Sequence, residues 1–170
     1  MKKLLLLSAI ALVAIGVQAQ QGDKSQRPSP PAKVSETISS GAVVSIDYSQ
    51  PAVKGRTIGN DIAPYGKIWR TGANEATVFE VNKDVKVEGK SLPAGKYGLY
   101  SIPGKDEWVI IFNKTWKQWG TNYTEGDDAL RVHVKPGKAP AFTERMTFAV
   151  DKSGKVSLLW GNEEVDFKVQ

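Results

Sequence analysis

Residues 97–112 read YGLYSIPGKDEWVIIF and contain two candidate β-strands joined by a turn. In residues 97–102 the side-chain character alternates with a period of two, which is typical of a strand. Residues 103–106, Pro-Gly-Lys-Asp, are a turn signal. Residues 108–112 are apolar at every position. The second strand is therefore expected to be buried on both faces and central in a sheet.

The same alternation continues on both sides of this hairpin. Further candidate strands cover residues 44–48, 77–82, 85–87, 130–134, 146–150, 156–160 and 165–169. Turn signals rich in Gly, Pro, Asn and Asp lie between many of them, at 82–84, 88–90, 93–95, 151–154 and 161–163. Short strands at this spacing are typical of an antiparallel sandwich or barrel. The sequence predicts an all-β fold, a single antiparallel β-sandwich or flattened barrel of about nine or ten strands.

Two stretches interrupt the strand pattern, Gln50 to Ala76 and Lys114 to Asp128. In a compact β domain, connections of this length are usually functional or cover a sheet edge. We therefore look for a site in these two segments first.

The beginning of the chain has a different composition from the rest. Residues 1–19 combine two lysines with an apolar run from Leu4 to Val17, and Val17-Gln18-Ala19 has small residues at the positions that a signal peptidase reads. Residues 1–19 are therefore expected to be a signal peptide. Residues 20–32 are expected to be a flexible linker because residues 20–31 lack apolar side chains other than proline. Residues 33–170 are expected to form a single β domain, exported to the periplasm or secreted.

Composition narrows the chemistry. The chain of 170 residues has no Cys and one His, which excludes disulfides, thiol nucleophiles and Cys-ligated metals. Removing residues 1–19 takes away two lysines and lowers the formal net charge from +5 to +3. Because basic and acidic residues are interspersed, a nucleic-acid partner is not expected. No apolar run after residue 19 is long enough to span a membrane, so no membrane span is expected after signal cleavage.

The first long segment contains WRTGANE, residues 69–75. Trp69 offers a flat apolar face, and Arg70 offers a planar fork of donors for a carboxylate or phosphate. Asn74 can donate and accept hydrogen bonds, and Glu75 can accept them or act as a base. These groups favour a binding site for a small polar or anionic molecule or a glycan.

A structural role is the alternative for the same residues. Arg70 and Glu75 can pair with each other, Asn74 can bond backbone amides, and Trp69 can fill the core. Gly72 permits either a positive φ or close approach by another group. Spacing alone leaves both interpretations open.

Three other residues are candidates for the surroundings of this segment. Arg56 either adds positive charge to the same mouth or is a solvated loop charge. Tyr97 and Tyr100 are candidate ligand-binding residues, although their opposite parity in a strand means that at most one faces a given site. The alternative for both tyrosines is core packing with satisfied hydroxyls.

The second long segment contains Trp116, Trp119 and Tyr123. These aromatic side chains can stack on sugar rings, or they can fold down as a cover over the open end of the sandwich. A nearby acidic group of Glu125, Asp127 and Asp128 does not have the spacing of an EF-hand calcium loop and is interpreted as a solvated turn.

The remaining titratable candidate is the single histidine, His133. It alternates with apolar neighbours between Arg131 and Lys135, so it is expected to face solvent. We identify no catalytic residue, no metal site and no cofactor from the sequence.

The strings YSQPAVKGR (48–56), PYGKIWRTGANEAT (64–77), LPAGKYGLYSIPGKDEWVIIFN (92–113), QWG and LRVHV together resemble the domain-of-unknown-function family twenty-nine-eleven. The resemblance extends over about residues 33–170, and WRTGANE is its most distinctive string. It implies an exported protein of Gram-negative bacteria. The family has no established activity, so the resemblance implies an identity and no mechanism.

The leading functional hypothesis is a non-enzymatic small-molecule or glycan binding module. One alternative is a hydrolase or lyase that uses Glu75 as acid or base, with Arg70 stabilising negative charge. A second alternative is an envelope protein–protein interaction module.

Overall fold

The alternating segments pair into one large antiparallel sheet and two hairpins. The computed structural model describes residues 23–170, in which ten strands are present: β1 (Pro31–Thr37), β2 (Val43–Ser49), β3 (Thr77–Val81), β4 (Val85–Val87), β5 (Lys90–Leu92), β6 (Gly95–Ile102), β7 (Trp108–Asn113), β8 (Asp128–Val134), β9 (Pro136–Val150) and β10 (Lys155–Lys168). Two short 3₁₀ helices, η1 (Lys24–Gln26) and η2 (Glu125–Asp127), complete the described elements. The predicted all-β class and strand number are confirmed.

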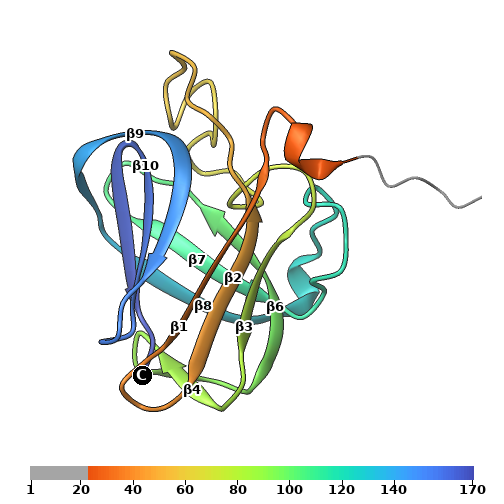
Figure 1. Ribbon diagram of the computed structural model, residues 1–170, viewed down its shortest axis with the longest axis vertical. Helices are drawn as coiled ribbons and strands as arrows, with labels where there is room; N and C mark the ends of the chain where they lie inside the picture. Colours follow the sequence, from red (N-terminus) through yellow and green to blue (C-terminus); the bar gives the residue numbers. More distant parts are fainter. Residues whose placement is uncertain (1–22) are drawn as a thin grey trace, which may run out of the picture.

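The large sheet has six strands in the order β1-β2-β3-β6-β7-β8. The long hairpin of β9 and β10 lies across one face of this sheet, so the two layers form a sandwich (Figure 1). The small hairpin of β4 and β5 lies at one end. At the opposite end, the segment between β2 and β3 rises above the sandwich, and residues of this segment build the candidate site described below.

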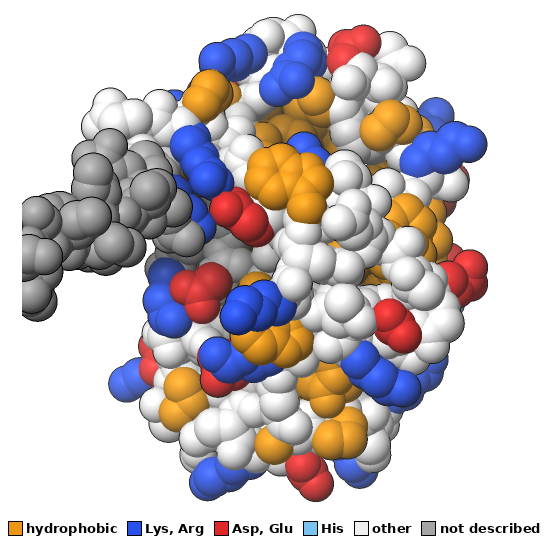
Figure 2. Space-filling view, turned by 90° about the vertical axis from the view of Figure 1, so that its right-hand side faces the viewer, with side chains coloured by type: hydrophobic (Ala, Val, Ile, Leu, Met, Phe, Trp, Pro, Cys, Tyr) orange, Lys and Arg blue, Asp and Glu red, His pale blue; other side chains and the backbone are white. Residues whose placement is uncertain are grey.

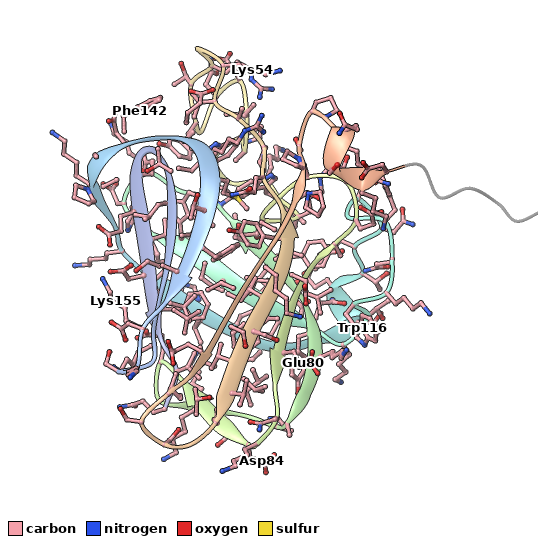
Figure 3. All side chains as sticks on the ribbon, viewed as in Figure 1. Lys54, Glu80, Asp84, Trp116, Phe142 and Lys155 are labelled. Carbon is pink, nitrogen blue, oxygen red and sulfur yellow. The ribbon has the colours of Figure 1, made fainter. Side chains whose placement is uncertain are left out.

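The main core fills the space between the six-stranded sheet and the β9–β10 hairpin (Figure 3). Phe79 and Phe112 come from the sheet and Phe167 from the hairpin, with ring centroids 5.0 to 6.2 Å apart. A smaller cluster of Ala76, Tyr100 and Ile111 lies apart from this core. Strand β7 contributes to both clusters and pairs with strands on both sides, which confirms its apolar, central character.

The predicted turn at residues 161–163 is wrong. Strand β10 runs through this position as one element, and its register with β9 shifts on both sides of Gly161. Gly161 has a φ of 60°, so it forms a bulge that bends the strand instead of reversing it. Strands β1 and β5 and the first half of β9 were not among the predicted strands either, because their polar or proline-containing sequences lack the alternation.

The predicted signal peptide, residues 1–19, lies outside the described residues. Within the expected linker, residues 23–32 are described, and they lie against the domain. The Arg145 side chain donates to the Pro28 carbonyl at 3.1 Å, and strand β1 already begins at Pro31. Lys24 and Arg27 also form ion pairs with Glu75. Such polar and backbone contacts cannot be predicted from the number of apolar side chains.

Among residues 23–170, none of the helices has the length and apolar character that a membrane crossing requires.

Candidate functional site

The segment around Trp69 is fastened to the end of strand β6 by backbone and side-chain hydrogen bonds. Trp69 N–H donates to Ser101 O at 2.8 Å, and Ser101 N–H donates to Trp69 O at 2.9 Å. The Thr71 hydroxyl donates to Ser101 Oγ at 2.9 Å, and the Thr77 hydroxyl donates to Thr71 O at 2.9 Å. The segment is therefore held at fixed points on the sheet, although it contains no regular strand.

Gly72 is required for close approach and not for an unusual φ. A Cβ at this position would lie 2.6 Å from Thr77 Oγ1 and 3.3 Å from Ser49 O. The positive φ values fall on its neighbours Thr71 (48°) and Asn74 (61°). Non-glycine residues in this region carry backbone strain, which persists where surrounding contacts hold the conformation.

Trp69 packs against core residues and also lines the surface of the site. Its ring stacks on Trp160 at a centroid distance of 5.2 Å and meets Trp108 edge-on at 6.1 Å. The indole is only partly buried, and it lines two surface cavities. The core packing agrees with the structural interpretation, and the cavity lining leaves Trp69 accessible to a ligand.

Arg70 lies beside a cavity of about 430 Å³ that is also lined by Ile68, Trp69, Gly120, Thr121 and Tyr123. We call it the Tyr123 cavity. The Arg70 side chain is half-buried, and its guanidinium makes no hydrogen bond or ion pair with any other residue of the described range 23–170. A cation in this position is available to a ligand.

Gly120 fixes the Arg70 stem from the other side. A Cβ on Gly120 would lie 2.4 Å from Arg70 Cδ and 2.9 Å from the Asn74 carbonyl oxygen. Gly120 N–H donates to that same carbonyl at 3.0 Å. The two long segments of the sequence thus meet at Arg70, and only glycine allows them to come this close.

A second cavity, of about 330 Å³, is also lined by Trp69 and Arg70. We call it the Arg56 cavity; Arg56, Ser29 and Trp160 also line it. The Arg56 guanidinium donates to Val53 O at 3.1 Å and to Ala52 O at 2.7 Å. Arg56 is exposed, as the solvated-charge interpretation expected, and it also lines this cavity together with Arg70.

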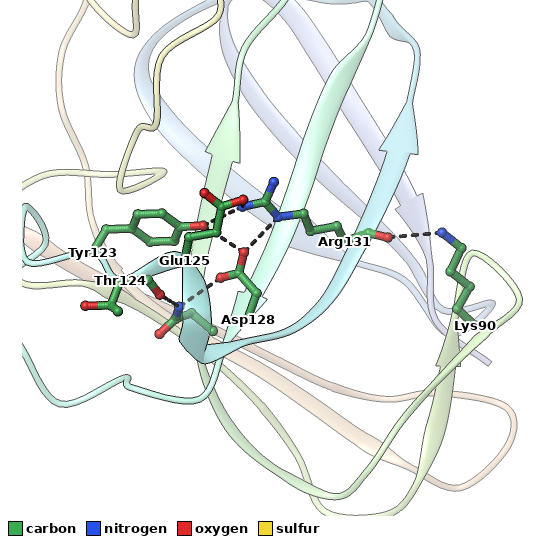
Figure 4. A network of polar contacts seen from close by, with 7 residues as sticks. Lys90, Tyr123, Thr124, Glu125, Asp128 and Arg131 are labelled. Atoms are coloured by element: carbon green, nitrogen blue, oxygen red, sulfur yellow. Dashed lines mark hydrogen bonds and ion pairs between the residues drawn. The ribbon is translucent and has the colours of Figure 1, made fainter.

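Tyr123 is held by a polar network at the end of the second long segment (Figure 4). Its hydroxyl donates to Asp128 Oδ2 at 2.7 Å and accepts from Arg131 Nη2 at 2.8 Å. Arg131 Nε also donates to Asp128 at 2.7 Å. Burial and the bond to Asp128 raise the pKa of Tyr123 to about 12, which keeps the phenol protonated at neutral pH.

The second long segment folds down as a cover on the sheet. The Tyr123 ring packs on the fully buried Tyr100 at 5.0 Å, and Gln118 Nε2 donates to the Tyr100 hydroxyl at 3.1 Å. Trp116 lies under the ammonium group of Lys96, 5.2 Å from the ring centroid. Trp119 keeps 48% of its surface exposed.

Glu75 and Asn74 do not join Arg70. Glu75 pairs with Lys24 at 3.2 Å and with Arg27 at 2.8 Å, and it lines a separate cavity of about 180 Å³. Burial opposes its ionisation, but its own backbone N–H together with Arg27 and Lys24 outweighs this and lowers the Glu75 pKa to about 2. Asn74 Nδ2 donates to the Ser29 carbonyl at 3.1 Å. Both side chains hold the segment before β1.

The two tyrosines of strand β6 lie on opposite faces of the sheet, as their parity predicts. Tyr97 is in the main core and donates to Pro93 O at 2.9 Å. Tyr100 is fully buried in the smaller cluster beneath Tyr123. Neither lines the Tyr123 cavity or the Arg56 cavity, and Tyr100 contributes only as support for Tyr123.

The histidine is exposed, as expected, with Nδ1 2.8 Å from Glu107 Oε1. The acids of the predicted solvated turn bond to protein groups, such as Asp127 to the Thr115 hydroxyl and Asp128 to Asn113. Within residues 23–170, no group of three or more His, Asp or Glu side chains is arranged to hold a metal ion.

Sequence reasoning missed three residues that line the Tyr123 cavity, Ile68, Gly120 and Thr121, and it did not place Tyr123 beside Arg70. The two separate long segments were the available signal, but their side-by-side packing is a tertiary contact.

On the side of the molecule where residues 114–127 lie, hydrophobic and basic side chains are neighbours over the upper half of the surface (Figure 2).

Comparison with known proteins gives one match. A family model described as "Protein of unknown function (DUF2911)" matches residues 29–169. No curated protein and no solved structure matches the chain.

Proposed function

We propose, from the premise that this chain belongs to the DUF2911 family of proteins of unknown function, that it is a non-enzymatic binding module for a small polar or anionic ligand, glycans included. The ligand site is the Tyr123 cavity. The observation that carries the proposal is the Arg70 guanidinium, which has no partner within residues 23–170 and lies beside an aromatic-lined cavity. We also propose that the protein is exported, on the lysines and apolar run of residues 2–17.

The chemistry of the cavity fits binding. A guanidinium presents donors in a fork that matches carboxylate, phosphate or vicinal oxygen groups. Trp69, Ile68 and Tyr123 supply apolar surface for the body of the ligand. Small-molecule sites typically combine such apolar walls with few polar groups that fix orientation.

The hydrolase or lyase alternative needs Arg70 and Glu75 to act on one ligand. The two residues line different cavities, and Glu75 is neutralised by Lys24 and Arg27. A carboxyl group whose pKa is about 2 is ionised at neutral pH, so it has no proton to donate and is a weak base. These observations support the binding proposal over this alternative.

The test is a thermal-shift screen of the protein against sugars, small organic acids and metal ions. A ligand that binds only the folded state raises the melting temperature, by about 5 °C or more at 100 times its dissociation constant. The expected result is a hit that raises the melting temperature of wild type and not of Arg70→Met.

Lys67→Met is the matched control, because it removes one positive charge from the same segment and Lys67 lines neither of the two cavities. It should respond like wild type. Either of two results would contradict the proposal: no compound stabilises the wild type, or every hit stabilises Arg70→Met equally.

A further inference from the structure

We propose that the ligand is an amphiphilic organic anion, whose oxyanion lies between Arg56 and Arg70 in the Arg56 cavity and whose apolar body lies in the Tyr123 cavity. This inference rests on the function proposed above and adds the chemical class of the ligand. An amphiphilic organic anion here means one carboxylate, sulfate or phosphate group on a small apolar body.

The Arg56 cavity carries two positive charges and no compensating acid. Arg56 and Arg70 both line it, and no Asp or Glu of the described range 23–170 does. Arg56 is exposed and Arg70 is half-buried, and like charges that line one cavity repel each other. An anion placed between them removes this cost and gains charge-assisted hydrogen bonds.

Arg56 is preorganised for this role. Its Nε and Nη2 groups donate to the Val53 and Ala52 carbonyls, which fixes the plane of the guanidinium. Its Nη1 group makes no hydrogen bond within residues 23–170. Arg56 therefore loses less conformational entropy on ligand binding than a free surface arginine does.

Trp69 and Arg70 line both cavities, so they form the boundary between the two. A ligand that contacts Arg70 with its anionic group can extend along Trp69 toward Ile68 and Tyr123. The Arg56 side supplies charge and the Tyr123 side supplies mainly apolar surface. This division favours an amphiphile over a neutral sugar, which offers no charge to the two guanidiniums.

The experiment titrates ¹⁵N-labelled protein with three probes at constant ionic strength and follows amide and indole N–H resonances. Phenyl phosphate carries both parts of the predicted ligand, benzyl alcohol carries only the body, and sulfate carries only the charge. Trp160, Gly72 and Ala73 line only the Arg56 cavity and report on it, and Gly120, Thr121 and Tyr123 report on the Tyr123 cavity. Phenyl phosphate should shift both groups and bind about tenfold or more tightly than either partial probe.

The variants separate the two proposals. Arg56→Met should weaken phenyl phosphate and sulfate about tenfold or more and leave benzyl alcohol unchanged, while Lys67→Met should leave all three unchanged. Arg56→Gln serves as a second variant, because it keeps a donor for the loop carbonyls while losing the charge.

Three results would overturn the inference. In the first, phenyl phosphate binds no better than benzyl alcohol; in the second, it binds equally to wild type and to both Arg56 variants. Either result would contradict an anionic ligand group and leave the binding proposal standing. In the third, only sulfate shifts resonances, and neither organic probe shifts those of residues 120–123. This result would contradict an amphiphilic ligand and would also count against the binding proposal.

Discussion

Arg70 and Glu75 lie in one short string of the sequence, yet their side chains meet different surroundings. The backbone between them passes through positive φ at Thr71 and Asn74, so the chain direction changes twice. Arg70 turns toward the second long segment, and Glu75 turns toward Lys24 and Arg27. At the scale of single residues, the candidate site depends on this divergence.

Glu75 gives a pH-dependent prediction. Its pKa in the folded protein, about 2, lies below its ordinary value of 4.5. The stabilisation from its ion pairs is therefore fully present above about 4.5 and is lost as the pH falls toward 2. Because the carboxyl is 41% exposed, we expect only about 1 kcal/mol or less. An NMR titration of the Glu75 carboxyl should show a midpoint near 2.

Arg27→Ala should move this midpoint upward, toward the ordinary value. Lys33→Ala should not, because Lys33 pairs with Asp47 at 3.0 Å and not with Glu75. A wild-type midpoint close to 4.5 would show that the pairs with Lys24 and Arg27 do not form in solution.

At the scale of elements, the bulge in β10 allows one long strand to follow a curved path. Gly161 interrupts the register with β9 on both sides, and the strand on each side of it supplies core residues, Trp160 before the bulge and Phe167 after it. Gly161 also packs closely on Ile58, from the segment that carries Arg56. The bulge therefore bends the hairpin and contacts the segment between β2 and β3, which builds the site.

Gly161→Ala should destabilise the protein by about 1–2 kcal/mol, measured by urea denaturation. The φ of 60° is unfavourable for alanine, and the added Cβ would lie 3.0 Å from Ile58 Cδ1. Gly137→Ala is the matched control in the same hairpin, because its Cβ would meet only Glu164 O, at 3.7 Å. Equal losses in the two variants would argue against the bulge.

At the scale of the whole molecule, one aromatic cluster joins the two layers. Phe79 and Phe112 from the sheet meet Phe167 from the hairpin, and all three are 3% exposed or less. No disulfide is possible, since the chain has no Cys. The layers are held together mainly by burial of such side chains, so we expect them to unfold as one unit.

Phe112→Ala should lower the free energy of unfolding by about 3–5 kcal/mol, because it leaves a cavity between the layers. Phe142→Ala is the control, since Phe142 is 56% exposed, and it should cost less than about 0.5 kcal/mol. Urea transitions followed by circular dichroism and tryptophan fluorescence should coincide in both variants. Separate transitions would mean that the hairpin and the sheet are independent units.

The fold class follows from local patterning. Alternation with period two in residues 97–102 and the wholly apolar residues 108–112 indicate which positions face a core, and turn residues mark most of the reversals. Where the pattern is weak, at β1 and at Gly161, prediction failed. Strand β1 is polar and pairs along one edge of the sheet, and a glycine within a bulge has the same composition signal as a glycine in a turn.

The sequence by itself determined the all-β class, the family and the two long segments in which a site was expected. Only the tertiary structure decided that Arg70 faces Gly120 and Tyr123, that Arg56 shares a cavity with it, and that Glu75 belongs to the segment before β1. Strand periodicity arises from neighbours along the chain and is visible in one dimension. Contacts between irregular segments far apart in sequence depend on how the layers pack, and no local pattern records that packing.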